Sequence, residues 1–363
     1  STPKPSSAAS DVYKRQGLGV PNPHEVDPYF FIRFTFPILF GIMFADLAHG
    51  LMLVLIGSFL TYKKKKKKIK PDESITGYLY KGAGLLIYTG LFAMLFGLLF
   101  GTFLGDEELL PELYAQLGLH WLPVILYPLH QVKTLLAFSL IIGFVLMQFV
   151  IWLRVLQNIR YGHDKASILA PIFLSIFYVG LFAILYDLIC KDTIWHYGAI
   201  HLETGEIVAF KSLTFPTIPP LVIKVFVVIT LVSLVLVFIM EYLHKKTDGI
   251  MEAIDHVLAL LSNTLSFSRL MALLLVHAIL ASIPFRLINN LRPLSPMWWV
   301  AGLLMGIIII VPLEGLLSFL NSLRLHWVEL FNKFYVGDGI PYKPIKVSYS
   351  YIKLEKPVSY THL

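Results

Sequence analysis

Polar side chains that could handle charge recur on one face of the mostly apolar stretch Ile250–Phe285. With about 100° and 1.5 Å per residue, one helical face carries four of them: Asp255, Ser262, Ser266 and Arg269. The guanidinium of Arg269 stays charged at any pH that a protein meets. A charge at the centre of a bilayer costs about 2.5–3.5 kcal/mol on insertion scales. We therefore interpret Arg269 as a charge that controls a moving charged group, with a structural arginine paired to a nearby acid as the alternative.

The last apolar stretch, Met297–Phe331, repeats this pattern in the opposite direction. Glu314, Ser318 and Asn321 share a face, and Arg324 lies about 15 Å beyond Glu314 toward the cytoplasm. If the two helices lie side by side, His277 and Glu314 form an outer polar group. An inner group then contains Asp255, Ser262 and Arg324, with Arg269 between the two groups.

This arrangement predicts two water-filled half-paths that do not meet, because a fixed positive charge separates them. Carboxylates and histidine suit such paths, since their pKa values can be tuned toward working pH. The alternative is that two ion pairs, Glu314–Arg324 and Asp255–Arg269, only neutralise each other in a packed bundle.

Asp46 and His49 form a weaker candidate site. They lie three residues apart and could share a helix face and bind an ion, although we favour an interpretation in which they cap a break in the helix. His326-Trp327 is interpreted as an interfacial anchor. The glycines Gly90, Gly97 and Gly101 indicate close helix packing.

The composition predicts a polytopic membrane protein. Hydrophobic residues make up 56% of the chain and charged residues only 15%, whereas soluble domains are nearer a quarter charged. The single cysteine, Cys190, excludes an intrachain disulfide. Much of the net charge of +7 comes from Lys63–Lys68 and Lys70 beside a span end, where membrane topology explains it better than nucleic acid does.

An all-α bundle of about eight transmembrane helices is predicted, with the last two long and tilted. The first block, Phe30–Tyr62, is interpreted as two short spans that break at Ala45–Gly50. The others are Tyr80–Leu104, Val132–Leu153, Ile168–Cys190, Pro220–Leu243, Ile250–Phe285 and Met297–Phe331.

Loop charges predict the orientation. With a cytoplasmic N-terminus, the inner loops carry twelve Lys or Arg residues and the outer loops four, as the positive-inside rule requires. The C-terminus is then cytoplasmic as well. If Phe30–Tyr62 is a single span, the position of the N-terminus alone changes.

The domain organisation follows from the same reading. Residues 17–356 form the membrane domain, while residues 1–16 and 357–363 are interpreted as non-native or disordered tails. Ser6–Gln16 and Val358–Leu363 resemble translated sequencing-adapter read-through, so we expect the chain to be a fragment.

Three segments give the chain a family resemblance. They are Phe36–Gly50, which contains FADLAHG; Asn263–Leu273 followed by His277-Ala278; and Glu314-Gly315 followed by Ser322–Glu329 and Lys333–Gly339. In order and spacing they resemble the membrane half of the a/I subunit of V-type and archaeal-type rotary ATPases, from about Gly17 to Lys356. The chain departs from the family pattern at Ala45, Ala48, Ala259 and Met271, which loosens any detailed claim about the channel.

The resemblance implies a stator without covalent chemistry or cofactor, coupling proton or sodium transport to ATP hydrolysis or synthesis. Arg269 matches the essential arginine that faces the proteolipid (c/K) ring, and Arg324 matches a second arginine. Glu314, His277 and Asp255 match polar positions of the half-channels. The expected partners are the ring, the central and peripheral stalk subunits and lipid. The cytoplasmic N-terminal domain that binds the peripheral stalks in the family is absent from this sequence.

The resemblance also implies an integral, multi-pass location, in the cell membrane of a prokaryote or an endomembrane of a eukaryote. A stand-alone secondary ion transporter is the alternative function, but such folds usually have related halves with matching broken helices. Here only the first block is visibly broken. A purely structural membrane anchor is a third possibility, which predicts that Arg269, His277 and Glu314 tolerate neutral replacement together.

Overall fold

The computed structural model describes residues 28–67, 75–107, 109–116, 124–161, 165–190, 194–201, 208–214, 218–291 and 296–335. These residues belong to one compact unit, Val26–Tyr335. The predicted tails, 1–16 and 357–363, lie outside the described residues.

Helices dominate the described chain, as the sequence predicts. They are α2 (Pro28–Met43), α3 (Leu47–Lys67), α4 (Ile75–Phe100), α5 (Leu109–Gln116), α6 (Val132–Arg160), α7 (Lys165–Cys190), α8 (Pro220–Lys245), α9 (Thr247–Ser266), α10 (Ser268–Leu291) and α11 (Pro296–Arg324). A π-helical segment, η1 (Leu325–Leu330), and a short 3₁₀ segment, η2 (Phe331–Lys333), follow α11.

Five of the described helical segments are long and apolar enough to cross a membrane. They are Thr76–Phe100, Val132–Arg160, Ser167–Ile189, Pro220–Leu243 and Asp248–Pro284. An apolar helix over Phe31–Met43 is shorter. These segments agree with the predicted integral membrane protein, while the number of eight spans stays a prediction. The segment Asp248–Pro284 has 37 residues, which would make about 55 Å as one continuous helix, well beyond the roughly 30 Å of a hydrocarbon core.

One element was not predicted. Between α7 and α8 the chain forms an antiparallel hairpin of β1 (Ile194–His201) and β2 (Val208–Thr214), paired from Ile194 with Thr214 to His201 with Val208. The strand sequences IWHYGAIH and VAFKSLT are rich in β-branched and aromatic residues, which favour strands. The predicted all-α class holds for the bundle, and the hairpin is an addition in the loop between α7 and α8.

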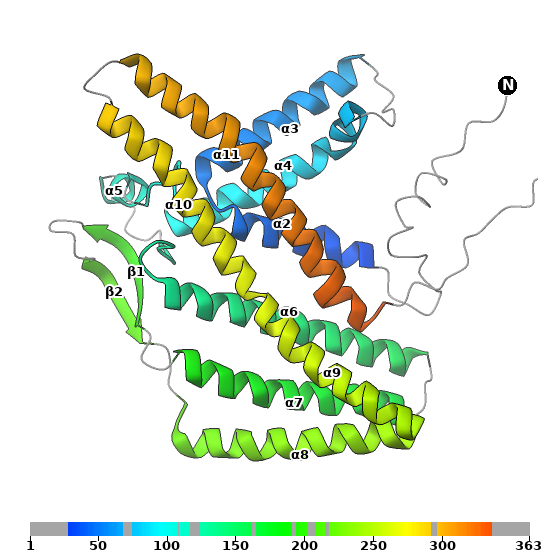
Figure 1. Cartoon of the computed structure of the whole chain (residues 1–363). Coiled ribbons are helices and arrows are strands. Elements are labelled where there is room, and N and C mark those ends of the chain that lie inside the picture. Colours follow the sequence, from blue (N-terminus) through cyan, green and yellow to red (C-terminus); the bar gives the residue numbers. More distant parts are fainter. Residues whose placement is uncertain are drawn as a thin grey trace, which may run out of the picture. The chain divides into compact units, whose positions relative to one another are not determined.

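The helices α6, α7 and α8 lie side by side (Figure 1). Helices α9 and α10 follow one another along nearly one line and cross this layer, with α9 packed on α8 and α10 packed on α6. On its other side α10 contacts α11 and α2. Helix α10 therefore joins the first helices of the chain to the last one, and it carries both Arg269 and His277.

The predicted break in the first apolar block is confirmed, since α2 ends at Met43 and α3 begins at Leu47. Helix α4 packs directly against this break. A Cβ atom on Gly97 would lie 2.4 Å from the backbone nitrogen of Leu47, so only glycine fits there. Gly90 is in similar contact with the backbone of Gly50, which confirms the expectation of close packing for these two glycines. Gly101 instead has a φ of +68° at the end of α4, where a helix terminus favours glycine.

A second break divides the predicted helix Ile250–Phe285 at Phe267, between α9 and α10. The N–H of Phe267 donates to the carbonyl of Thr264 at 3.2 Å, and the N–H of Leu270 donates to the carbonyl of Phe267 at 2.9 Å. The buried ring of Phe267 packs against Gly143 of α6, where a Cβ would lie 2.6 Å from the ring. The count of one continuous helix from Asp255 to Arg269 is therefore wrong at this point.

Candidate functional site: two polar clusters on helix α10

Asp46 closes the break between α2 and α3. Its Oδ1 accepts a hydrogen bond from the backbone N–H of His49 at 3.0 Å, and its Oδ2 accepts one from the N–H of Gly105 at 2.7 Å. The first bond is the N-cap bond of α3. The nearby Thr102 hydroxyl donates to the carbonyl of Ala45 at 2.7 Å. The capping interpretation is thus confirmed, and the polar backbone groups of the break have partners inside the protein.

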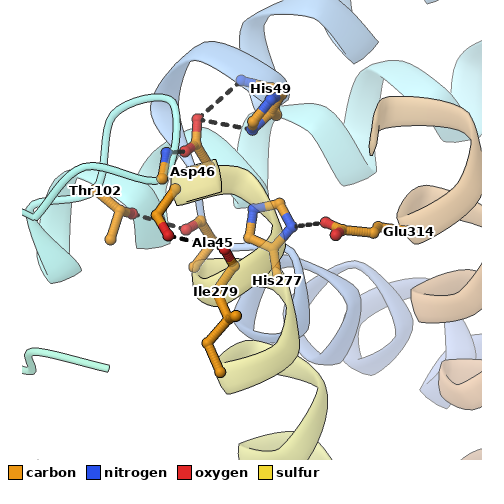
Figure 2. A network of polar contacts seen from close by, with 9 residues as sticks. Ala45, Asp46, His49, Thr102, His277, Ile279 and Glu314 are labelled. Atoms are coloured by element: carbon orange, nitrogen blue, oxygen red, sulfur yellow. Dashed lines mark hydrogen bonds and ion pairs between the residues drawn. The ribbon is translucent and has the colours of Figure 1, made fainter. Parts of the chain in front are cut away.

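His277 of α10 and Glu314 of α11 form a buried pair, as the outer group of the sequence analysis predicts. Nδ1 of His277 contacts Oε2 of Glu314 (Figure 2), and both residues are at least 96% buried. A hydrogen bond between a carboxylate and an imidazole is charge-assisted when either group is ionised. Nε2 of His277 and Oε1 of Glu314 have no hydrogen-bond partner among the described residues.

The two predicted sites, Asp46 with His49 and His277 with Glu314, meet in one place, which the sequence did not indicate. The rings of His49 and His277 are 5.5 Å apart between centroids in an edge-to-face arrangement. Phe44 packs against His277 at 4.6 Å between centroids. We define the outer cluster as Asp46, His49, His277 and Glu314; all four are buried. Three elements, the α2–α3 break, α10 and α11, therefore build a polar cluster inside an apolar bundle.

Arg269 lies at the start of α10, and its acidic neighbour is Glu329 in the π-helical segment η1. Nη1 of Arg269 is 3.6 Å from Oε1 of Glu329, and the two side chains are 25% and 2% exposed. Nη1 makes no hydrogen bond within the described part of the chain. The hydroxyl of Ser266 donates to the same Oε1 of Glu329, and the amide of Asn263 donates to the carbonyl of Glu329 at 3.3 Å. The contact is thus an ion pair that leaves a quarter of the arginine exposed.

This contact corrects the alternative of Asp255–Arg269 and Glu314–Arg324 ion pairs. In the structure Arg269 pairs with Glu329 and Glu314 pairs with His277. In the alternative of a structural Arg269, the paired acid is therefore Glu329. Ser266 and Arg269 both reach Glu329, so the prediction that these two share a face is confirmed despite the turn at Phe267.

The predicted inner group is more open than the outer cluster. Asp255, Ser262 and Arg324 are exposed, and no ion pair joins Asp255 to Arg324 in the described part of the chain. The formation of an inner path by these residues therefore stays a prediction.

Two residues of this region were missed or misread in the sequence. The sequence pattern gives Glu329 no role beyond its place in a motif, and it predicts an interfacial anchor at His326. His326 is fully buried, with Nε2 2.6 Å from the hydroxyl of Thr35 and Nδ1 2.6 Å from the carbonyl of Ser322. The anchor interpretation is wrong for His326. Because η1 is π-helical, the α-helical period no longer predicts which residues share a face after Arg324.

Comparisons with known proteins match the segments that build these clusters. A family model described as the V-type ATPase 116 kDa subunit family matches residues 16–108 and 246–347. An A-type ATP synthase subunit I from Aeropyrum pernix is 28% identical over 373 residues, covering 97% of this chain and 51% of that protein. A similar subunit I from Pyrococcus horikoshii is 26% identical over 344 residues, covering 93% of this chain and 46% of that protein.

A eukaryotic protein is also similar. The human V-type proton ATPase 116 kDa subunit a 4 is 24% identical over 445 residues, covering 90% of this chain and 53% of that protein. The chain thus spans about half the length of these curated relatives. The matched residues include the α2–α3 break, Arg269, His277, Glu314 and Glu329. This chain belongs to the V-type ATPase 116 kDa subunit family.

Proposed function

We propose that this chain is the membrane stator of a rotary ATPase and carries protons, or sodium ions, between itself and a rotating proteolipid ring. Its relatives are named as subunits of an A-type ATP synthase and of a V-type proton ATPase. Ions bind a ring carboxylate from one half-path and leave through the other as the ring turns. The chain itself does no covalent chemistry; ATP is hydrolysed or made elsewhere in the complex.

One observation carries this proposal: Arg269 pairs with Glu329, yet part of its side chain stays exposed. Its guanidinium has an acid 3.6 Å away and keeps a quarter of the side chain exposed on α10. A permanent charge in apolar surroundings costs free energy, so we expect a residue such as Arg269 to have a function there. Such a cation attracts a passing carboxylate, favours its ionised form and thus releases its proton. It also repels a free cation, which prevents a direct leak between the two half-paths.

The two polar groups supply the half-paths in this proposal. The outer cluster lies on the outer side, with His277 and Glu314 as the groups that exchange protons. Asp255, Ser262 and Arg324 lie on the inner side, where their exposure suits contact with water or with the ring. Arg269 lies between these groups along the chain, so a carboxylate must pass it when moving from one path to the other.

Arg269→Ala in the intact complex tests the proposal. We expect ATP-driven ion uptake into proteoliposomes to fall to background while the complex still assembles, because the substitution removes the charge and leaves α10 in place. Arg33→Ala is the matched control: Arg33 is an exposed arginine of α2 with no acidic partner among the described residues. Full transport by the Arg269→Ala complex would contradict the proposal.

A purely structural Arg269 is the second candidate, and the contact with Glu329 favours it. A buried ion pair is strongly destabilising when one partner is removed. On this view, Arg269→Ala and Glu329→Gln both cause loss of assembled complex, and transport per assembled complex is unchanged. Measuring assembly and transport in the same preparation separates the two functions.

A further inference from the structure

Three residues of the outer cluster lie close enough together to bind one metal ion. Asp46, His49 and His277 each offer one oxygen or nitrogen atom, and these three atoms lie within 4.8 Å of one another. The three residues are 0%, 1% and 3% exposed. They come from two separate parts of the chain, the α2–α3 break and α10, so the packing of α10 against α2 brings them together.

Two imidazole nitrogens of the cluster make no hydrogen bond among the described residues. Nδ1 of His277 is occupied by Glu314, which leaves Nε2 without a hydrogen-bond partner among the described residues. Figure 2 shows this second nitrogen on the side of the ring that faces Asp46 and His49. Nδ1 of His49 lies 3.3 Å from Oδ1 of Asp46, but it makes no hydrogen bond within the described residues either. Buried polar atoms without partners are destabilising, so each of them requires an explanation.

The arrangement of His277 is the one found at metal sites. A metal-bound histidine usually gives its other ring nitrogen to a carboxylate, which fixes the tautomer and the ring orientation. When Nδ1 carries the ring proton toward Glu314, Nε2 keeps a lone pair on the side of Asp46 and His49. Asp46 is held by two backbone N–H groups, which orient its carboxylate in the same way.

We propose that Asp46, His49 and His277 bind a divalent transition-metal ion of the Zn²⁺ class, with Glu314 orienting His277. Two imidazole nitrogens and one carboxylate oxygen form a ligand set that suits zinc, with a fourth position open to water. Tetrahedral zinc with bonds of about 2.0–2.1 Å places its ligand atoms about 3.3 Å apart. The present spacing of up to 4.8 Å is wider, so metal binding requires the three ligand atoms to move closer together.

A metal ion at this place also regulates transport, an inference that rests on the proposed function. Bound metal occupies Nε2 of His277 and so removes the nitrogen that would exchange a proton in the outer half-path. We therefore expect Zn²⁺ on the outer side to inhibit ion transport, and chelation to restore it.

Metal binding is tested directly, without any transport assay. The intact complex is stripped with a chelator, dialysed against micromolar free Zn²⁺ and analysed for zinc per copy of this chain. We expect His49→Gln and Asp46→Asn complexes to hold one zinc ion fewer than the wild type at this concentration. Asp46→Asn keeps an oxygen that can cap α3, so it reports on the site even if His49→Gln assembles poorly. Equal zinc content in all assembled complexes overturns the metal site.

His130→Gln provides the matched control, because His130 is a more exposed histidine that pairs with Glu107 outside the outer cluster. We expect it to bind zinc as the wild type does; a loss equal to that of His49→Gln overturns the assignment. Substituting Co²⁺ and recording its visible absorption gives a second readout, since four-coordinate Co²⁺ absorbs strongly. A spectrum unchanged by Asp46→Asn likewise overturns the site.

Transport measurements then separate this inference from the proposed function. If His49→Gln raises the Zn²⁺ concentration for half-inhibition at least tenfold, both are supported. If zinc binds the wild type but does not slow transport, the metal site stands and the outer half-path through His277 is contradicted. If zinc does not bind, the metal site fails and the proposed function is unaffected.

Discussion

The outer cluster and the inner group differ in how much of their environment this chain supplies. The outer cluster is buried, and its members are held by bonds from α3, the loop that contains Gly105, and α11. The inner residues Asp255, Ser262 and Arg324 are exposed on α9 and α11. From this difference in burial we propose that the chain alone forms the outer half-path, whereas the inner half-path also needs the ring. Substitutions should therefore affect folding at the outer cluster and mainly transport at the inner group.

The largest expected effect on stability is that of Glu314→Gln. The substitution keeps the shape of the side chain but removes the charge that faces Nδ1 of His277. Breaking a buried pair by removing one partner typically costs about 3–5 kcal/mol. We expect a clear drop in the apparent unfolding temperature of the detergent-solubilised complex, together with loss of transport. An unchanged unfolding temperature would show that the pair does not stabilise the outer cluster.

Gly97→Ala tests the packing that supports the outer cluster, and it changes no polar side chain. The added Cβ would lie 2.4 Å from the backbone of the α2–α3 break, and overpacking typically costs about 1–3 kcal/mol. We expect lower thermal stability and weaker zinc binding, because the cap at Asp46 shifts. Gly82→Ala on the same helix is the control, since a Cβ there meets nothing within 4 Å. Equal effects of the two substitutions would contradict the packing argument.

Asp255→Asn tests the inner group. Because Asp255 is exposed, its neutralisation should change stability by no more than about 0.5 kcal/mol. Transport should nevertheless fall, since the inner path loses a carboxylate that attracts cations. Unfolding temperature and ion uptake are measured on the same preparation. A large loss of stability with normal transport would contradict the claim that the inner group serves transport more than folding.

The last prediction is a pH dependence of stability at Lys333, in the short segment that follows α11. Burial, and then the nearby Arg154, lower the pKa of Lys333 to about 8, from an ordinary value of 10.5. Between these two values the unfolded chain binds more protons than the folded one, so stability contributed by this group rises with pH. Lys333→Gln should therefore stabilise the complex at pH 7 and stabilise it less near pH 9.5, where the folded protein no longer carries this charge but the unfolded chain still does. Thermal unfolding at both pH values checks this; the same shift at each would exclude a role for the Lys333 charge.

Much of this arrangement could be predicted from the sequence because charges are rare in apolar helices. The pattern of His277 and Glu314 on two long helices led to their pairing, and the polar interruption at Asp46 led to the helix break. Both depend on local rules of helical period and capping. The resemblance to the rotary ATPase subunits depends on short motifs and is confirmed by the family match.

Other features could not be predicted because they depend on tertiary packing. The meeting of His49 with His277 requires α10 to pack against α2, which no periodicity reveals. Glu329 faces Arg269 from a π-helical segment, where counting by the α-helical period fails. The ring of Phe267, at the turn, packs on Gly143 of α6, a contact that the sequence of α9 and α10 does not reveal.

The central claim is that Arg269 acts on a passing carboxylate and is more than the structural partner of Glu329. Exchanging the two charges in the double variant Arg269→Glu, Glu329→Arg tests this most directly, because the ion pair is kept with reversed polarity. Ion uptake is measured in proteoliposomes that contain equal amounts of assembled complex. Our account predicts an assembled complex that does not transport ions; recovery of wild-type transport by the exchanged pair would contradict it.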